Sequence, residues 1–160
     1  MTATEPIKVI QGEIFNDYRG TIHSMNTFSF EGVERYYFIR NVDTGLVRGW
    51  HGHQFERKWF QCVAGSFTMA FVAPDDWEHP SKSLRPEIYR ISERKSEIIC
   101  VPAGYANCLR AEEPGSVLMV LSGKRYPECL EDSWRYPADY WFDWASFHNG
   151  SKSRDSVPLR

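Results

Sequence analysis

The segment Arg48–Gly65, with the sequence RGWHGHQFERKWFQCVAG, dominates the interpretation of this chain. It places His51 and His53 two positions apart, shortly after Arg48. Side chains at positions i and i+2 point to the same side only in an extended strand, so both imidazoles are expected to face one cavity. Imidazole titrates near neutral pH, and two rings directed at one point predict proton transfer or metal binding. The competing interpretation is one solvent-facing and one hydrogen-bonded core histidine, which the flanking Arg48 and Lys58 disfavour.

Short strands separated by turns are expected along the rest of the chain. We expect them at residues 7–15, 21–30, 35–42, 46–53, 59–63, 67–72, 87–91, 97–101, 105–109 and 116–121. Turn-forming residues separate these strands and no helical periodicity of useful length intervenes, which indicates an antiparallel sandwich or barrel. Residues 74–86 are polar and are expected to form a loop. Residues 132–144, DSWRYPADYWFDW, interleave aromatic and acidic side chains, which predicts a short helix across a barrel mouth or a dimer contact.

Length, net charge and cysteine content restrict the kind of protein that this sequence can encode. A chain of 160 residues is expected to form one domain, here residues 1–150, followed by a polar and frayed tail at 151–160. A formal net charge of -2 argues against general nucleic-acid or membrane binding, so any anionic ligand requires a local cluster of Arg and Lys. Four cysteines without a C-x-x-C motif and an N-terminus without an apolar signal core predict a reduced cytoplasmic protein.

Motifs spread along the chain resemble those of the nucleotide-sugar cupins. In order, they are DYRG at 17–20, RGWHGH at 48–53, Lys58, Gly65 and VPAGYAN at 101–107. This family contains the dTDP-4-dehydrorhamnose 3,5-epimerases and the dTDP-4-keto-6-deoxyhexose 3,4-ketoisomerases of deoxysugar and surface-polysaccharide biosynthesis. The resemblance extends over about residues 15–126 and implies an all-β cupin jelly-roll β-barrel, here with an aromatic-rich C-terminal extension. It also implies a homodimer that exchanges N-terminal strands, a dTDP-linked substrate, and no required metal or cofactor.

The epimerase motif implies roles for individual residues of this chain. The catalytic base falls on His51, the active-site lysine on Lys58 and a substrate-binding arginine on Arg48. Arg19 of the DYRG motif is expected to reach the pyrophosphate of a nucleotide sugar bound to the neighbouring subunit.

Two residues of the chain depart from the epimerase pattern. Asn107 stands where the epimerases carry a histidine, and it is expected to contact the substrate or to fix the adjoining turn. Met119 stands where they carry the catalytic tyrosine, and Tyr126 or a tyrosine of the extension is a possible substitute. The ketoisomerase pattern contains both histidines of the pair and an active-site tyrosine, which corresponds here to Tyr37. The choice between the two branches stays open.

Both reactions begin with removal of a hydrogen next to a sugar ketone. His51 is the expected base and His53 the expected proton shuttle, while Arg48, Lys58 or Tyr37 stabilises the enolate oxygen. Return of the proton to the neighbouring carbon moves the ketone from C4 to C3. Return to the opposite face of the same carbon inverts that centre and requires a second acid.

Two other classes of protein compete with this interpretation. A metal-dependent cupin oxygenase would use His51, His53 and Glu56, but Asn107 occupies the place of the third histidine. A non-catalytic sugar-binding cupin is compatible with the fold but has no need of the histidine pair. Individual residues also have plainer interpretations: Tyr37 as a core residue, Lys58 as an exposed lysine, Arg19 as a solvated one, and Arg48 in an ion pair with Glu56 or Asp17.

Overall fold

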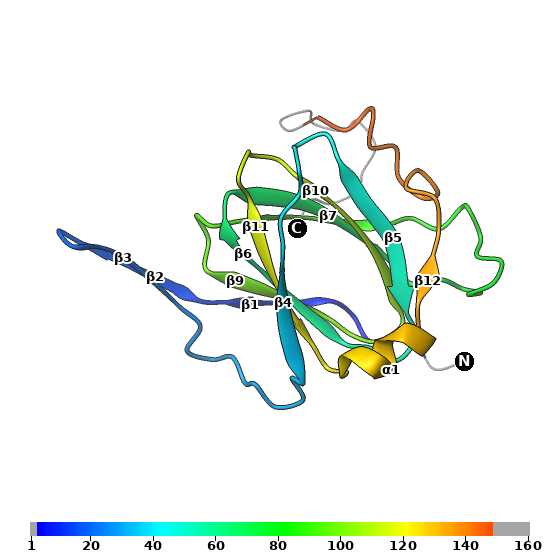
Figure 1. Cartoon of the computed structure of the whole chain (residues 1–160), viewed down its shortest axis with the longest axis horizontal. Coiled ribbons are helices and arrows are strands. Elements are labelled where there is room, and N and C mark those ends of the chain that lie inside the picture. The colour runs from blue at the N-terminus through cyan, green and yellow to red at the C-terminus, as the bar shows by residue number, and fades with distance from the viewer. Residues whose placement is uncertain (1–2, 149–160) are drawn as a thin grey trace.

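The strands of the chain form two facing antiparallel sheets and a separate hairpin in a computed structural model that describes residues 3–148 (Figure 1). The first five-stranded sheet has the order β1 (Lys8–Gln11), β9 (Glu97–Val101), β6 (Lys58–Ala64), β11 (Val117–Ser122) and β4 (Arg35–Ile39). The second has the order β12 (Trp134–Arg135), β5 (Val47–His53), β10 (Tyr105–Ala111), β7 (Ser66–Val72) and β8 (Glu87–Ser92). The hairpin consists of β2 (Glu13–Asp17) and β3 (Gly20–Ser24), and the helix α1 spans Tyr126–Glu131. The all-β expectation is confirmed; the tail at 151–160 lies outside the described residues.

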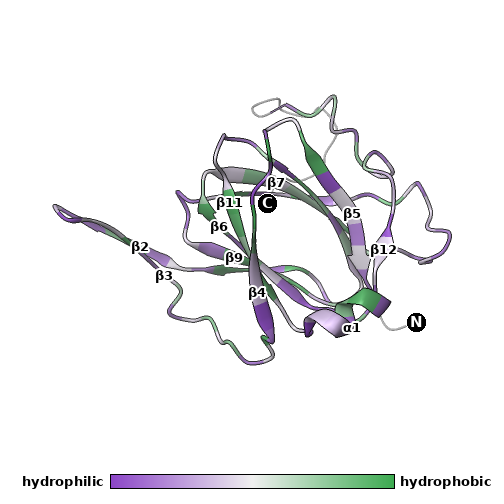
Figure 2. Ribbon diagram, viewed as in Figure 1, coloured by the Kyte–Doolittle hydropathy of each residue, from purple (hydrophilic) through white to green (hydrophobic). Residues whose placement is uncertain are grey.

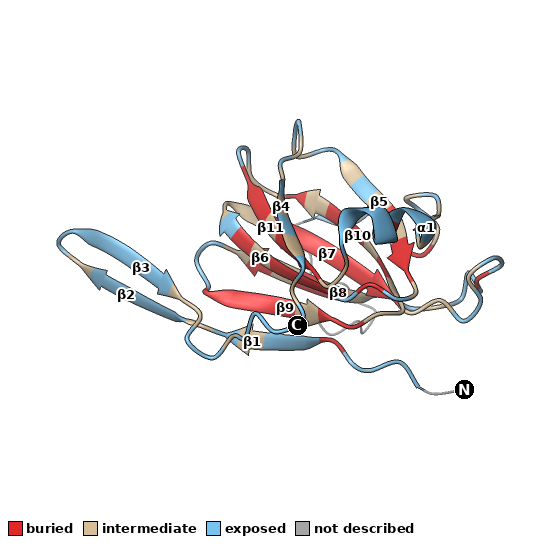
Figure 3. Ribbon diagram, turned by 60° about the horizontal axis from the view of Figure 1, so that its bottom comes forward, coloured by how far each residue is buried: buried red, intermediate tan, exposed pale blue. Residues whose placement is uncertain are grey.

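Two of the expected strands differ from those observed. The strand expected at residues 7–15 is divided at Gly12, because β1 pairs with β9 whereas β2 pairs with β3. A Cβ atom at Gly12 would lie 2.2 Å from the Ser24 carbonyl oxygen, so only glycine allows the backbone to pass this close to Ser24 between β1 and β2. The strand expected at residues 21–30 ends at Ser24. Beyond Gly12 the hairpin extends away from the two sheets and is largely exposed (Figure 3).

The main core lies between the two sheets. Apolar residues are frequent on β6, β7 and β11 (Figure 2), and alternate ones point inward. Phe60, Leu118 and Val120 of the first sheet pack with Phe71 and Leu109 of the second, and all are 2% exposed or less. Each such side chain contributes about 1.5–3 kcal/mol on burial. The core therefore provides a rigid support on which the walls of a cavity are built.

The C-terminal extension covers the outer face of the second sheet. Small residues on that face, Ala70, Ala106 and Cys108, leave room for the rings of Trp50 and Trp141, which meet edge to face with centroids 5.1 Å apart. This second cluster explains why the extension is rich in aromatic residues: most of them pack against their own chain.

The expectation of a helix within residues 132–144 is wrong. The helix lies directly before that segment, at Tyr126–Glu131, where Pro127 occupies the first turn and the Glu128 carboxylate accepts a hydrogen bond from the Arg125 amide at 3.0 Å. Residues 132–144 instead form β12 and a series of turns. Three of their side chains hold the loop after β7: Tyr136, Tyr140 and Trp141 donate hydrogen bonds to the carbonyl oxygens of residues 77, 80 and 81, respectively. In the described part of the chain, the helix is too short and too polar to cross a membrane.

Candidate active site

An irregular residue in β5 determines which side chains face the inside. Two consecutive residues of β10 pair with His51 and Gly49, so Trp50 is an extra residue on its strand, a β-bulge. The bulge reverses the alternation of side chains at this point. Arg48 therefore faces the same cavity as His51 and His53, although a regular strand would place it on the opposite side. The indole of Trp50 points outward into the aromatic cluster.

Glycine and asparagine hold this bulge together. Gly49 has φ +124°, a backbone conformation that other residues rarely adopt, and a Cβ there would lie 2.6 Å from the Asn107 carbonyl oxygen. The Asn107 side-chain amide donates a hydrogen bond to the His51 carbonyl oxygen at 3.2 Å. Asn107 therefore fixes the backbone that carries the histidine pair, and its side chain also lines the cavity.

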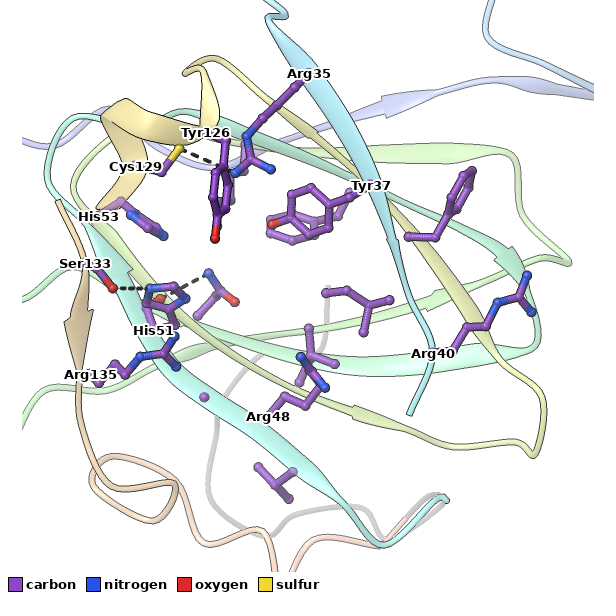
Figure 4. A pocket seen from close by; sticks show the side chains of 18 of the residues that line it. Arg35, Tyr37, Arg40, Arg48, His51, His53, Tyr126, Cys129, Ser133 and Arg135 are labelled. Atoms are coloured by element: carbon purple, nitrogen blue, oxygen red, sulfur yellow. Dashed lines mark hydrogen bonds between the residues drawn. The ribbon is translucent and has the colours of Figure 1, made fainter. Parts of the chain in front are cut away.

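The cavity opens between the sheets, beside α1 and β12 (Figure 4). Its volume is about 850 Å³, within the range of about 300–1,000 Å³ that is typical of small-molecule sites. The rings of His51 and His53 lie at one end with centroids 4.4 Å apart. The expectation that both imidazoles face one cavity is confirmed.

His53 is held by groups that lie outside the cavity. Its Nδ1 donates a hydrogen bond to the Asp132 carbonyl oxygen and lies 3.0 Å from the Glu56 Oε2. Because a carbonyl oxygen can only accept, Nδ1 carries the hydrogen of the neutral ring and Nε2 carries the lone pair. Nε2 has no hydrogen-bond partner among residues 3–148. Burial lowers the pKa of His53, as does the charge of Lys58, while Glu56 opposes the shift.

His51 lies in a more positive environment. Its Nε2 is 2.9 Å from the Ser133 hydroxyl oxygen. Burial lowers the pKa of His51 to about 3, and nearby His53, Lys58 and Arg135 add to the effect. Both rings are therefore neutral at physiological pH.

The rest of the lining is cationic. The charged side chains among the described lining residues are all basic: Arg35, Arg40, Arg48, Lys58 and Arg135. Arg35 stacks on the rings of Tyr37 and Tyr126, with its Cζ 4.8 and 5.5 Å from their centroids. This is the local Arg and Lys cluster that an anionic ligand requires in a chain of net negative charge. Figure 4 shows the histidines at one end of the cavity and Arg40 at the other.

Most of the residues singled out in the sequence meet in this cavity. Those that line it are Tyr37, Arg48, His51, His53, Lys58 and Asn107, together with other residues that the sequence analysis did not assign. Lys58 is 8% exposed, so its interpretation as an exposed strand lysine is wrong. The suggested pairing of Arg48 with Glu56 or Asp17 is also absent from the ion pairs of the described residues, in which Asp17 binds Arg19 and Glu56 contacts Arg35, Lys58 and His53.

Arg19 and Met119 lie away from the cavity. Arg19 is at the turn of the β2–β3 hairpin, where its side chain is 68% exposed and binds Asp17 at 2.5 Å. Met119 is on β11, but its side chain packs into a cluster with Trp59 on the outer face of the sheet. A tyrosine at this position of the strand would not face the histidines. Tyr126, the suggested substitute, does line the cavity.

Several site residues could not be assigned from the sequence. Arg35, Ser133 and Arg135 line the cavity, while Asp132 and Glu56 contact His53 from behind. Asp132, Ser133 and Arg135 belong to the aromatic segment whose contacts the sequence left open, whereas Arg35 on β4 and Glu56 between β5 and β6 carry no local signal of a site. Among the described residues no group of three His, Cys, Asp or Glu side chains is arranged to hold a metal ion.

Comparison with known proteins shows the family and the fold of the chain. The protein-family model described as "FdtA: WxcM-like, C-terminal" matches residues 5–151. The chain belongs to this family. No curated protein sequence gives a significant match.

Solved structures resemble the chain over most of its length. QdtA, a sugar 3,4-ketoisomerase from Thermoanaerobacterium thermosaccharolyticum in complex with TDP, has 22% identity and a TM-score of 0.63, over 84% of this chain and 90% of that one. A 3,4-ketoisomerase from Helicobacter canadensis has 17% identity and a TM-score of 0.61, over 84% and 91%. The 3,5-epimerase RmlC from Legionella pneumophila, in complex with dTDP-4-keto-L-rhamnose, has 18% identity and a TM-score of 0.65, over 81% and 71%. The chain therefore has the cupin fold of these isomerases.

Proposed function

We propose that this protein is a 3,4-ketoisomerase that acts on a dTDP-4-keto-6-deoxyhexose. The observation that carries the proposal is the pair of neutral imidazoles, 4.4 Å apart, at one end of a cavity lined by basic side chains. Membership of the FdtA family and the fold of known 3,4-ketoisomerases support it. The amide of Asn107, which lines the cavity where the epimerase pattern has a histidine, argues against that pattern.

The proposed reaction moves one carbon-bound and one oxygen-bound hydrogen. A base breaks the C3–H bond, and the electron pair flows through C3–C4 to give an enediolate with negative charge on O4. Protonation of C4 and loss of the O3 hydroxyl proton form the C3 ketone, while O4 becomes a hydroxyl group. The sum is an isomerisation in which no electrons leave the sugar, so the proposed chemistry needs only proton carriers and hydrogen-bond donors.

The contacts of the two histidines favour different roles. The Nε2 of His53 is buried at the cavity wall and has no hydrogen-bond partner among the described residues, and Glu56 behind the ring offsets the positive charge that a captured proton brings. His51 faces basic groups and a hydroxyl group, which suits proton relay between the sugar oxygens. We therefore assign the C3 proton to His53 and the relay to His51, the reverse of the expectation from the epimerase motif. Lys58 and Tyr37 are the proposed donors to O4.

The opposite end of the cavity suits the nucleotide diphosphate. Arg40 is exposed there, Arg48 is exposed between it and the histidines, and both can reach an anionic group that enters from solvent (Figure 4). A homodimer in the cytoplasm remains part of the proposal. The β2–β3 hairpin exposes apolar side chains, among them Phe15 at 58% and Ile22 at 60%, and docking of this hairpin on a second copy would carry Arg19 toward that copy's substrate. Sedimentation at micromolar concentration is expected to show a dimer, and a monomer would remove Arg19 from the proposal.

Solvent isotope exchange tests the reaction. The protein is incubated with a dTDP-4-keto-6-deoxyhexose in heavy water, and the sugars are analysed by NMR. A 3-keto product with deuterium at C4, or recovered substrate with deuterium at C3, is the expected result. Inversion at C3 and C5 would instead show an epimerase, and no exchange would leave a sugar-binding protein. One equivalent of iron with oxygen consumption would show an oxygenase.

Two variants test the assignment of the base. H53N is expected to lower the rate of C3 exchange by about 10²–10⁴-fold, since a positioned base contributes that much. H51N is expected to retain measurable C3 exchange while it slows formation of the 3-keto sugar. The reverse pattern would return the role of base to His51.

A further inference from the structure

A fully buried carboxylate lies behind the histidine pair. The Glu56 side chain, in the loop between β5 and β6, has no solvent exposure. Its Oε1 accepts a hydrogen bond from the Ser122 hydroxyl at 2.6 Å. The same oxygen lies 3.6 Å from Arg35 Nη2 and 3.9 Å from Lys58 Nζ. Because removal of a charged carboxylate from water is costly, a site that retains one needs compensating positive groups.

The second oxygen of this carboxylate is directed at His53. Glu56 Oε2 has no hydrogen-bond partner among the described residues and lies 3.0 Å from His53 Nδ1. The hydrogen on Nδ1 is already donated to the Asp132 carbonyl oxygen. The charge of Oε2 is therefore unshared while the imidazole is neutral. When Nε2 accepts a proton, the ring becomes a cation in direct contact with this oxygen.

His51 has no equivalent carboxylate in the described part of the chain. Its nearest polar partner is the Ser133 hydroxyl, and the charged groups that influence it are His53, Lys58 and Arg135. An added proton is thus disfavoured on His51 relative to His53, although the two rings are in contact.

We propose that Glu56 is a positioning residue that holds the ring of His53 and stabilises its imidazolium, so that the hydrogen taken from the sugar resides on His53 Nε2. The part of this statement that concerns the sugar rests on the proposed ketoisomerase function. The groups that face His53 are His51 on its own strand, Lys58 on β6, Glu56 in the connecting loop and Asp132 after α1; Arg35 on β4 acts through the carboxylate.

An isosteric variant tests the role of the charge. E56Q keeps the shape of the side chain and removes its negative charge, and E112Q makes the same change in an ion pair at the other end of β10, where Arg110 lies 2.9 Å from Glu112. E56Q is expected to lower kcat about 10–100-fold with KM within about three-fold, because a hydrogen-bonded charge is worth roughly that factor. E112Q is expected to leave both constants unchanged. If E56Q does not fold, E56D retains a charge for Arg35 and Lys58 and is expected to give an intermediate kcat.

Imidazole NMR titration without substrate separates this proposal from the proposed function. In the wild type, His53 is expected to take up a proton at higher pH than His51. In E56Q, or in E56D to a smaller extent, the proton affinity of His53 is expected to fall about tenfold or more. Equal titration of His53 in wild type and variant would overturn the proposal, as would failure of His53 to titrate in both before acid unfolding. This result is independent of whether the protein isomerises a sugar.

Discussion

Asp132 connects the C-terminal segment to the end of β5, and its removal has a calculable effect on stability. The Asp132 carboxylate accepts hydrogen bonds from the backbone amides of Gln54 and Phe55, both at 2.8 Å, directly after His53. A hydrogen bond to a charged group contributes about 1.5–3 kcal/mol. The side chain is only half-buried and Phe55 is exposed, so water replaces part of this loss. We expect D132A to lower the free energy of unfolding by about 2–3 kcal/mol.

Urea unfolding monitored by tryptophan fluorescence measures this change. D132N keeps an oxygen that can accept one of the two hydrogen bonds, and it is expected to lose about half as much. D139N, at an exposed position of the same segment, is the control and is expected to stay within about 0.5 kcal/mol of the wild type. A D132A variant as stable as D139N would show that these hydrogen bonds do not hold the end of β5.

Three further predictions concern the bulge, the core and pH. G49A is expected to lower the free energy of unfolding by about 2–4 kcal/mol and to abolish activity, since its Cβ would lie 2.6 Å from a carbonyl oxygen at φ +124°; urea unfolding checks this. T68V is expected to stabilise the protein by about 1 kcal/mol, because the buried Thr68 hydroxyl has no partner among residues 3–148; a raised thermal midpoint is the expected readout. His51 has a pKa near 3 when folded and 6.5 as its ordinary value, so unfolding takes up a proton between these limits and stability falls as pH drops below about 6.5. H51N is expected to lose less free energy of unfolding than the wild type between about pH 7 and about pH 5. The same pH dependence in both proteins would show that the lowered pKa of His51 is not the cause.

Local sequence patterns were sufficient for most of the strands and for the histidine pair. Alternation with a period of two places His51 and His53 on one side of a strand, and the structure keeps that relation because no irregularity lies between them. The same rule fails for Arg48, since the bulge at Trp50 shifts it to the face of the histidines. A bulge is defined by pairing with another strand, and that register is not encoded in neighbouring residues.

The site residues and contacts that the sequence analysis missed depend on interactions between distant parts of the chain. Glu56 was considered as a possible metal ligand or as an ion-pair partner of Arg48, but its position depends on Ser122, which lies 66 positions away. Asp132 reaches the end of β5 across 78 positions. The aromatic extension was interpreted as a helix or a dimer contact because no residue within it specifies the face of the sheet on which it packs. Arg19, assigned by motif alone, stays a prediction that concerns a second subunit.

The three hydrogen bonds from the aromatic extension to the loop after β7 all end on main-chain oxygens, those of Trp77, Pro80 and Ser81. Every amino acid supplies such an oxygen. Substitutions in this loop that preserve its course therefore leave its anchorage intact, whereas loss of a hydroxyl or indole nitrogen from the extension does not. Directed libraries placed at the exposed positions of this loop would therefore sample new surface chemistry on a fixed frame, whereas Trp77, whose ring meets that of Trp134, and Leu84, which packs against the aromatic cluster, are best left unchanged.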